Sequence, residues 1–362
     1  MINFDAINTL SDKQINDFLS QALKTLLQNK DLDSKTMRAV MLTIMHGRCP
    51  DALMGAILTA LHIKGESVSE ITAAASVMRE LADGINITDL SNVVDIVGTG
   101  GDGANLFNVS TAAAFVVASS GVVVAKHGNR GVSTKSGSSD LLASAGIRLD
   151  LNNIQVLQCL NEQNLGFLFA PNHHKAIKYA VGVRSQLKVR TIFNVLGPLT
   201  NPAGVINQVI GVFDESLCQP FAQVLKNLGS RHAIVVHSAD GLDEFSLAGE
   251  NFVSELKDGQ ITNSIISPSD VGLATQSLDG LSVESSKDSL ILIKQALAGK
   301  ATDLRIQKAQ DIIAFNAGAA IYVAGKASSL KEGVKSAQKI IASGQALIKM
   351  QNFAEFTQSF NS

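Results

Sequence analysis

The stretch that decides the fold runs from Asp95 to Asp140 and reads DIVGTGGDGANLFNVSTAAAFVVASSGVVVAKHGNRGVSTKSGSSD. It contains two loops rich in glycine and hydroxyl side chains, and each follows a short β-branched run, at residues 93–97 and 122–125. Such runs are typical of buried strands in a parallel sheet. Ligands of these sheets bind beyond the carboxyl ends of the strands. The sequence therefore predicts that both loops serve one ligand site.

The chemistry of the two loops indicates phosphate. The first loop, residues 98–103 (GTGGDG), lacks side chains where a backbone would have to approach a ligand, and its glycines permit an anion nest of N–H groups. Residues 108–111 then open an apolar helix, whose N-terminus attracts anions. The second loop adds side-chain donors between Lys126 and Ser138. Together these groups predict a ligand that carries more than one phosphate.

Each loop also has a plainer interpretation. A single glycine loop can be a tight turn, and residues 126–135 alone could be a solvated basic turn. Two such loops after two consecutive strands favour phosphate binding. Standard nucleotide motifs do not fit: GxxxxGK[ST] is absent, and the GxGxxG at residues 98–103 lacks the later acidic residue that a dinucleotide site needs.

The composition bounds the class of protein. The chain has 362 residues, enough for two domains, and is 46% hydrophobic and 17% charged, which predicts a sizeable core. A net charge of −2 argues against nucleic acid as a partner. Cys49, Cys159 and Cys218 show no metal-binding or disulfide pattern, and no signal peptide or membrane-spanning run is evident. We expect a cytoplasmic protein with no membrane partner.

The order of predicted elements gives the architecture. Residues 1 to about 90 favour helices, with a cap at Ser11 and a capping box at Ser67–Glu70. Strands then alternate with helices, as in a doubly wound sheet. We expect strands at 93–97, 122–125, 166–170, 207–213 and 233–237, a hairpin over 251–266, and helices at 112–119, 173–187, 216–228, 290–298, 303–324 and 330–341. The predicted class is α/β: a small all-helical domain plus a larger α/β domain with a mainly parallel central sheet.

At these motifs the chain resembles the anthranilate phosphoribosyltransferases of tryptophan biosynthesis. The matching residues are Gly98–Gly103, Asn108–Thr111, Lys126–Arg130, Ser133–Asp140, His174–Arg184, Arg190–Asn194, Gly197–Pro202 and Asp243-Glu244, in the order of that family. The resemblance implies that the helical domain comprises residues 1–92 and 172–203 and the α/β domain 93–171 and 204–362. It also implies that an apolar face of the helical domain forms a homodimer interface; ordinary core packing is the alternative.

The resemblance further implies a pentosyl-transferring glycosyltransferase. Its expected substrates are phosphoribosyl pyrophosphate and anthranilate, its expected cofactor is Mg²⁺, and no residue is assigned as acid or base. Donor-binding residues would be Gly98, Gly101, Asp102, Leu106, Asn108, Val109, Ser110, Thr111, Lys126, His127, Gly128, Asn129, Arg130, Gly131, Val132, Ser133, Thr134 and Ser138. Ser110, Asp243 and Glu244 would hold the metal, and Gly98, Asn129, His174 and Arg184 would contact anthranilate.

Three positions depart from the family pattern. Leu106 stands where a phosphate-binding Thr or Ser is usual, Lys175 replaces a Pro, and Lys188 replaces a Gly. The loss of the hydroxyl at position 106 predicts greater reliance on backbone donors, or weaker donor binding. The other two substitutions put the fine acceptor geometry in doubt, and leave the reaction class unaffected.

Two other functions remain open from the sequence. Pyrimidine nucleoside phosphorylases share the expected fold, but Asn129 and Arg184 match an anthranilate site instead. A non-catalytic, nucleic-acid-binding homologue would be expected to have a basic surface, which the net charge disfavours.

Overall fold

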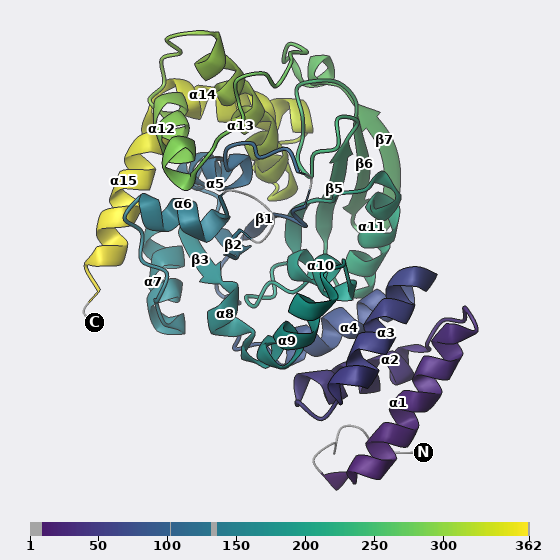
Figure 1. The fold of residues 1–362 in the computed structure, drawn as a ribbon. Helices are drawn as coiled ribbons and strands as arrows, with labels where there is room; N and C mark the ends of the chain where they lie inside the picture. Colours follow the sequence, from purple (N-terminus) through teal and green to yellow (C-terminus); the bar gives the residue numbers. More distant parts are fainter. Residues whose placement is uncertain (1–8, 102, 132–135, 361–362) are drawn as a thin grey trace. The chain divides into compact units, whose positions relative to one another are not determined.

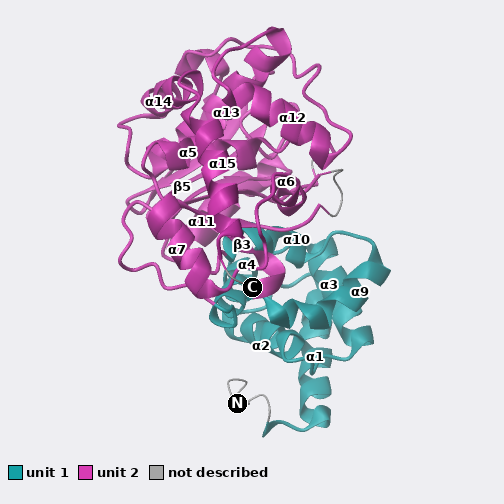
Figure 2. Ribbon diagram, turned by 90° about the vertical axis from the view of Figure 1, so that its left-hand side faces the viewer, with its two compact units in different colours: residues 1–83, 173–200 teal, residues 84–172, 201–362 magenta. Residues whose placement is uncertain are grey.

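The computed structural model describes residues 9–101, 103–131 and 136–360 (Figure 1). The chain forms two compact units, residues 1–83 with 173–200 (unit 1) and residues 84–172 with 201–362 (unit 2), as Figure 2 shows in colour. The boundaries expected after residues 92, 171 and 203 are corrected to 83, 172 and 200. The first moves most because Ile85 is buried in the core of unit 2.

Unit 1 is all-helical, and the predicted caps explain where its helices begin. Ser11 and Gln14 form a capping box at the first helix, and Ser67 and Glu70 form another at the fourth. Helix α1 packs on α3, α2 on α4, and α3 on α9. The elements are α1 (Asp12–Leu27), α2 (Ser34–Met45), α3 (Asp51–Lys64), α4 (Val68–Glu80), η2 (Lys175–Ile177), α9 (Lys178–Leu187), α10 (Ile192–Leu196) and η3 (Gly197–Leu199).

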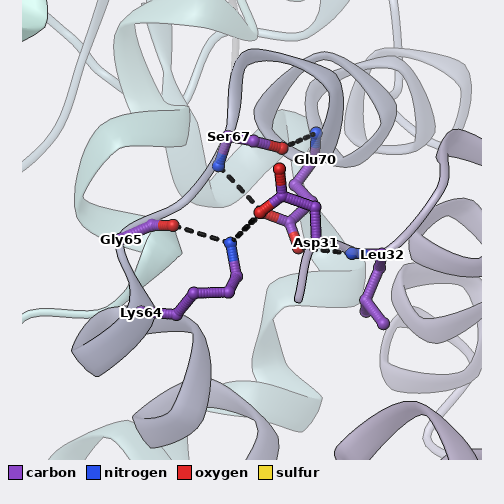
Figure 3. Close-up of polar contacts among 6 residues, drawn as sticks. All are labelled: Asp31, Leu32, Lys64, Gly65, Ser67 and Glu70. Carbon is purple, nitrogen blue, oxygen red and sulfur yellow. Dashed lines mark hydrogen bonds and ion pairs between the residues drawn. The ribbon is translucent and has the colours of Figure 1, made fainter. Parts of the chain in front are cut away.

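A buried polar cluster fixes the turn between α3 and α4 (Figure 3). The Glu70 carboxylate accepts hydrogen bonds from the backbone N–H groups of Leu32 at 2.9 Å and Ser67 at 2.8 Å. Lys64 Nζ lies 2.8 Å from the same carboxylate and 2.6 Å from Asp31. The cluster joins two helix ends to the segment before α2, and so holds unit 1 together at a point where three chain segments meet.

Unit 2 is built on one seven-stranded sheet in the order β3-β2-β1-β4-β5-β6-β7. The first five strands in this order run parallel, and β6 and β7 are antiparallel additions at one edge. The expected hairpin is therefore confirmed. The strands are β1 (Val94–Gly98), β2 (Val124–Gly128), β3 (Leu165–Phe169), β4 (Asn207–Gly211), β5 (His232–Ser238), β6 (Asn251–Lys257) and β7 (Gln260–Ile266).

Helices pack against this sheet. Helix α5 is buried along almost its whole length and packs against α13, and both contact β1. Helix α11 packs on β5 and β6, and α7 packs on β3. The remaining elements complete unit 2: α5 (Val109–Ser119), α6 (Ser138–Ser144), α7 (Asn153–Gln163), η4 (Glu215–Leu217), α11 (Cys218–Asn227), η5 (Pro268–Val271), α12 (Ser286–Leu297), α13 (Leu304–Val323), α14 (Leu330–Ala342) and α15 (Gln345–Gln358). Helix α8 (Ala170–His173) spans the boundary at residue 172.

Several predicted elements need correction. The single helix expected over residues 173–187 is three pieces, because His174 leaves helical geometry (φ −108°, ψ 56°). Helices α6, α7, α10 and α15 were not predicted. In the part of the chain that the structure describes, no helix combines the length and apolar character needed to cross a membrane.

Candidate functional site

The two glycine-rich loops leave adjacent parallel strands of unit 2. Strand β1 pairs with β2 in parallel, with Val94 opposite Val124, so the loops after Gly98 and Gly128 emerge at the same edge of the sheet. Asp102 and residues 132–135, which include the predicted Val132, Ser133 and Thr134, lie outside the described residues. Within the described residues, the two loops therefore begin at the same edge of the sheet, as expected.

Asn108 joins the two loops through its side chain. Its amide nitrogen donates to Ser136 O at 3.0 Å, and Ser136 Oγ donates to its amide oxygen at 2.7 Å. From α12, Ser289 Oγ donates to the same oxygen at 2.8 Å and accepts the Asn108 backbone N–H at 3.0 Å. The side chain of Asn108 therefore works within the protein, by linking three segments around the start of α5.

Lys126 is the buried cation of this region. It lies on β2, is 3% exposed, and donates from Nζ to Ile96 O and, at 3.3 Å, to Ser110 Oγ. Burial lowers its pKa, although the negative charges of Asp95, Glu244 and Asp243 oppose this. Lys126 thus brings positive charge to the N-terminus of α5, where Ser110 is the second helical residue.

Asp95 supplies negative charge beneath the loops. The carboxylate is fully buried on β1 and accepts hydrogen bonds from the His127 backbone N–H at 3.1 Å and from Asn201 Nδ2 at 2.8 Å. Burial raises the pKa of Asp95 to about 6, while Lys126 and these hydrogen bonds pull it down. The contact with His127 ties β1 to the end of β2, directly before Gly128, after which the second loop begins.

The acidic pair Asp243-Glu244 reaches the first loop from the segment after β5. Asp243 Oδ2 accepts the Gly100 backbone N–H at 2.6 Å, and Glu244 Oε1 accepts the Ser110 backbone N–H at 3.0 Å. This approach needs glycine on two strands: a Cβ at Gly98 would lie 2.3 Å from Asp243 Oδ2, and one at Gly211 would lie 1.4 Å from Asp243 O. Ser110, Asp243 and Glu244 therefore lie together, as the expected metal site requires.

The other predicted donor residues occupy three kinds of position. Val109 and Thr111 are buried in α5, and His127 is buried on β2. Leu106 packs against the core and pairs with Ser282 in an isolated β-bridge. The rest line the loops: Gly98, Gly101, Gly128, Gly131 and Ser138 are half-buried, and Asn129 and Arg130 are exposed. The Thr111 hydroxyl makes no hydrogen bond to any described residue, although it is buried.

Arg184 and His174 belong to unit 1, whereas Gly98 and Asn129 belong to unit 2. The Arg184 guanidinium is half-buried on α9 and lies 5.1 Å from the centre of the Phe193 ring. Burial lowers the pKa of His174 to about 4, and its Nε2 lies 2.9 Å from Thr200 O. His174 is therefore neutral at neutral pH and packed inside unit 1.

Comparison with known proteins now decides the family. Residues 90–347 match the α/β domain of a glycosyl transferase family, and residues 20–82 match its helical bundle domain. The chain is 57% identical over 358 residues to the anthranilate phosphoribosyltransferase of Psychrobacter sp. (strain PRwf-1), covering 97% of each chain. It belongs to the anthranilate phosphoribosyltransferase family.

Relatives from other organisms agree. The Acinetobacter baylyi anthranilate phosphoribosyltransferase is 56% identical, with 94% of this chain and 97% of the relative covered. Among solved structures, anthranilate phosphoribosyltransferase from Thermus thermophilus superimposes with a TM-score of 0.87 at 39% identity, over 93% of this chain and 99% of that one. The Saccharomyces cerevisiae enzyme in complex with phosphoribosyl pyrophosphate and Mg gives 0.85 at 28% identity, over 94% and 98%. Family membership sets aside the phosphorylase and nucleic-acid-binding alternatives.

The acidic pair fits the metal of this anthranilate phosphoribosyltransferase family. Asp243 and Glu244 are hard oxygen donors beside a hydroxyl, which suits Mg²⁺. Within the described residues no group of three or more His, Cys, Asp or Glu side chains is placed to enclose an ion. This arrangement suits Mg²⁺, which is usually shared between one or two carboxylates and substrate phosphates.

Sequence reasoning missed several residues that lie beside the two loops. Asp140, which closes the second motif, holds that loop by accepting the N–H groups of Gly131 at 3.1 Å and Gly137 at 3.0 Å. Ser289 lies far along the chain and carries no motif. Ser139 is buried, with a hydroxyl that makes no hydrogen bond inside the described chain. Of these, only Asp140 belonged to a recognisable pattern.

Proposed function

We propose that the chain transfers the phosphoribosyl group of phosphoribosyl pyrophosphate to the amine of anthranilate, giving N-(5-phosphoribosyl)anthranilate and pyrophosphate. This is the second step of tryptophan biosynthesis from chorismate. The observation that carries the proposal is the convergence of two donor-rich loops at adjacent strand ends, joined by Asn108 and Ser136. Membership of the anthranilate phosphoribosyltransferase family specifies the acceptor.

The reaction breaks the bond between C1 of the ribose and the pyrophosphate oxygen, which keeps the electron pair. A bond forms between C1 and the amine nitrogen, which then loses a proton. An aromatic amine needs little deprotonation before it attacks, so the protein chiefly has to stabilise the departing diphosphate and the cationic sugar and align the amine. A site made of N–H groups, hydroxyls and cations suits that task.

The donor would bind at the loops of unit 2. N–H groups of residues 98–103 and the side chain of Lys126 would contact the diphosphate and ribose. Asn129, Arg130 and Ser138 would contribute from the second loop. Asn108 would act by holding the two loops together, since its side chain already bonds to Ser136 and Ser289.

Mg²⁺ would be held by Asp243, Glu244 and the Ser110 hydroxyl together with the substrate's phosphates. When bound, the ion supplies positive charge that stabilises the leaving diphosphate. In this structure the two carboxylates accept the N–H groups of Gly100 and Ser110. These protein contacts alone hold both carboxylates beside the first loop, residues 98–103, and the start of α5.

Arg184 would bind the anthranilate carboxylate. A guanidinium forms bidentate hydrogen bonds with a carboxylate, and the ring of Phe193 supports the Arg184 side chain from within unit 1. This assignment rests on the resemblance to the family. The proposed contacts of anthranilate with Gly98, Asn129 and His174 rest on it too.

A coupled assay tests the function. Protein, Mg²⁺, phosphoribosyl pyrophosphate and anthranilate should together remove the fluorescence of free anthranilate, and omission of any one should prevent it. Arg184→Ala should chiefly raise the KM for anthranilate, whereas Asp243→Asn should weaken Mg²⁺-dependent use of the donor. Phosphorolysis of thymidine or uridine, with anthranilate untouched, would contradict the proposal.

Unit 1 would mediate a homodimer. An open groove of about 600 Å³ is lined mainly by apolar side chains of α1, α3 and α9, among them Leu27 and Ile63. Leu27 is 71% exposed and Ile63 80% exposed, as expected of residues that a second copy covers. Ile63→Asp should shift the mass measured by light scattering from dimer to monomer. Ile154→Asp, at an exposed isoleucine of unit 2, should not.

A cytoplasmic location also remains a prediction. It is supported by three buried, free cysteines, since proteins of reducing compartments keep their thiols unpaired. Fractionation of cells that express the chain would test it.

A further inference from the structure

The segment that carries Asp243 and Glu244 has no regular secondary structure, so its backbone must find hydrogen bonds elsewhere. Phe245, directly after Glu244, is fully buried. Its ring stacks on Phe315 of α13, with 4.5 Å between ring centres. A buried peptide group in such apolar surroundings is costly unless both its N–H and its C=O are paired.

Asn316 supplies both partners. Its Oδ1 accepts the Phe245 N–H at 3.0 Å, and its Nδ2 donates to Phe245 O at 2.9 Å and to Ile312 O at 3.0 Å. Asn316 is 2% exposed in the middle of α13, where its neighbours Ile312, Ile313 and Phe315 are fully buried. An amide at this position is unfavourable for helix packing alone, and its hydrogen bonds account for it.

We propose that Asn316 is a positioning residue for the metal site: it fixes the backbone beside Glu244 and so directs the Glu244 carboxylate toward the N-terminus of α5. The inference rests on the proposed function, because it assumes that Asp243 and Glu244 hold Mg²⁺ with the donor. The Glu244 carboxylate lies 3.0 Å from the Ser110 N–H, and Asp243 is seated against Gly98 and Gly211. Phe245 is the residue of this segment that α13 contacts, through the hydrogen bonds of Asn316 and the ring of Phe315.

Other hydrogen bonds hold the same segment, but they do not pair the backbone groups of Phe245. Ser246 N–H donates to Asn251 Oδ1 at 2.7 Å, and Ser246 Oγ donates to Asp240 at 2.7 Å. These bonds anchor the chain after Phe245, on the side away from the acids. Removal of Asn316 would therefore loosen the peptide next to Glu244 while the end of the segment stays in place.

The test compares Asn316→Leu with Gln310→Leu, a matched change on the same helix. Gln310 is a buried amide that donates to Ala296 O at 2.9 Å and Gly299 O at 3.3 Å, at the end of α12. Both changes replace a buried, hydrogen-bonded amide with an apolar side chain. Only Asn316 contacts the metal-binding segment, so a general loss of packing should affect both variants alike.

The readout is the affinity for Mn²⁺, measured by electron paramagnetic resonance with phosphoribosyl pyrophosphate present and anthranilate omitted, so that no turnover occurs. Residues that orient metal ligands typically contribute about 10- to 100-fold in affinity. We expect the Kd for Mn²⁺ to rise by about that factor in Asn316→Leu and to stay within about threefold of wild type in Gln310→Leu. The KM for anthranilate at saturating Mg²⁺ should not change.

Equal shifts in the two folded leucine variants, or no shift in Asn316→Leu, would overturn the inference. If Asn316→Leu does not fold, Asn316→Asp replaces it, since an aspartate can accept the Phe245 N–H but cannot donate to Phe245 O. Wild-type affinity in folded Asn316→Asp would equally overturn it. Wild-type protein that binds Mn²⁺ with the donor but leaves anthranilate unchanged would instead refute the proposed function alone.

Discussion

Lys64 in unit 1 and Lys126 in unit 2 both have buried side chains, but their ammonium groups have different partners. The Lys64 side chain in unit 1 is 5% exposed and contacts two carboxylates directly, those of Asp31 and Glu70 (Figure 3). Lys126 in unit 2 is 3% exposed, and its described partners, Ile96 O and Ser110 Oγ, are uncharged oxygens. Burial penalises both ammonium groups. At Lys64 the two carboxylates outweigh that penalty and raise the pKa, whereas at Lys126 burial prevails and lowers it.

The difference is between a charge that its own unit neutralises at close range and one that, under the proposed function, a bound anion would help to neutralise. A buried charge is stable when close partners replace the lost water. The partners of Lys64 belong to its own unit, so its electrostatic environment is complete without substrate. Those of Lys126 balance its charge only at a distance, through Asp95, Asp243 and Glu244. An anionic diphosphate would therefore be attracted to Lys126 and not to Lys64.

The largest expected effect comes from Lys126→Met. The change removes the buried cation while keeping an unbranched side chain of similar length. Loss of one preorganised group that stabilises transition-state charge costs about 10²- to 10³-fold. We expect kcat/KM for phosphoribosyl pyrophosphate to fall by about that factor in the anthranilate fluorescence assay. The secondary structure measured by circular dichroism should be retained.

Arg130→Met is the control for Lys126→Met, because Arg130 is exposed and any charge effect there is screened by water. We expect a smaller loss of activity from it. If Lys126→Met kept kcat/KM within about threefold of wild type, the contrast between the two lysines would carry no functional meaning.

Lys64→Met should act on stability instead of activity. It leaves the fully buried Glu70 carboxylate without its cation, and breaking a buried pair in this way costs about 3 kcal/mol. The free energy of unfolding, measured by urea titration, should fall by about that amount. The kcat/KM measured at room temperature should stay near the wild-type value. The double variant Lys64→Met with Glu70→Gln should recover part of the loss. A single variant as stable as wild type would contradict the structural role.

The two lysines also show what a sequence can reveal. Lys126 stands in a contiguous motif after a β-branched run, which marked it as a candidate phosphate ligand. The sequence placed it in the loop after residues 122–125, whereas it lies within β2 (Val124–Gly128). Near Lys64 the local pattern predicted the capping box at Ser67–Glu70, which the structure contains. It could not predict that Asp31 and Leu32, more than thirty residues earlier, bind the same cluster.

In unit 2, too, local patterns were predictable and contacts between distant residues were not. The strands and the Asp258-Gly259 hairpin followed from local patterns. Helix α6 was hidden because its first residues, Ser138 and Ser139, resemble a turn. Asn316 and Ser289 act through contacts with Phe245 and Asn108, distant in sequence, and no local spacing marks them. Local patterns in the sequence thus predicted the glycine-rich loops better than the distant residues that hold them in place.

His174 differs from Lys64 and Lys126 because it is a buried base that stays neutral. Burial lowers its pKa from 6.5 to about 4, so the unfolded chain binds this proton more readily than the folded one. Its contribution to stability is complete above pH 6.5 and is lost as the pH falls toward 4. The difference of 2.5 between these pKa values corresponds to at most roughly 3–4 kcal/mol.

Urea titrations between these two pH values should show that loss in the wild-type chain and a shallower one in His174→Gln. Glutamine has no proton to bind in this range, and its amide can still donate to Thr200 O. Parallel pH profiles for the two proteins would show that His174 is not the group responsible.

The smallest expected effect concerns Lys188, an exposed lysine. Lys188 is the residue after α9 and lies in the left-handed region, with φ 52° and ψ 24°, a conformation that glycine adopts without strain. A side chain there costs roughly 1–2 kcal/mol, whereas glycine adds about 0.5–1 kcal/mol of unfolded-state entropy. Lys188→Gly should therefore raise the free energy of unfolding by less than about 1 kcal/mol. Lys188→Ala should give no such gain, because alanine keeps the Cβ that causes the strain. Equal gains from the two variants would mean that loss of the lysine, and not relief of backbone strain, stabilises the chain.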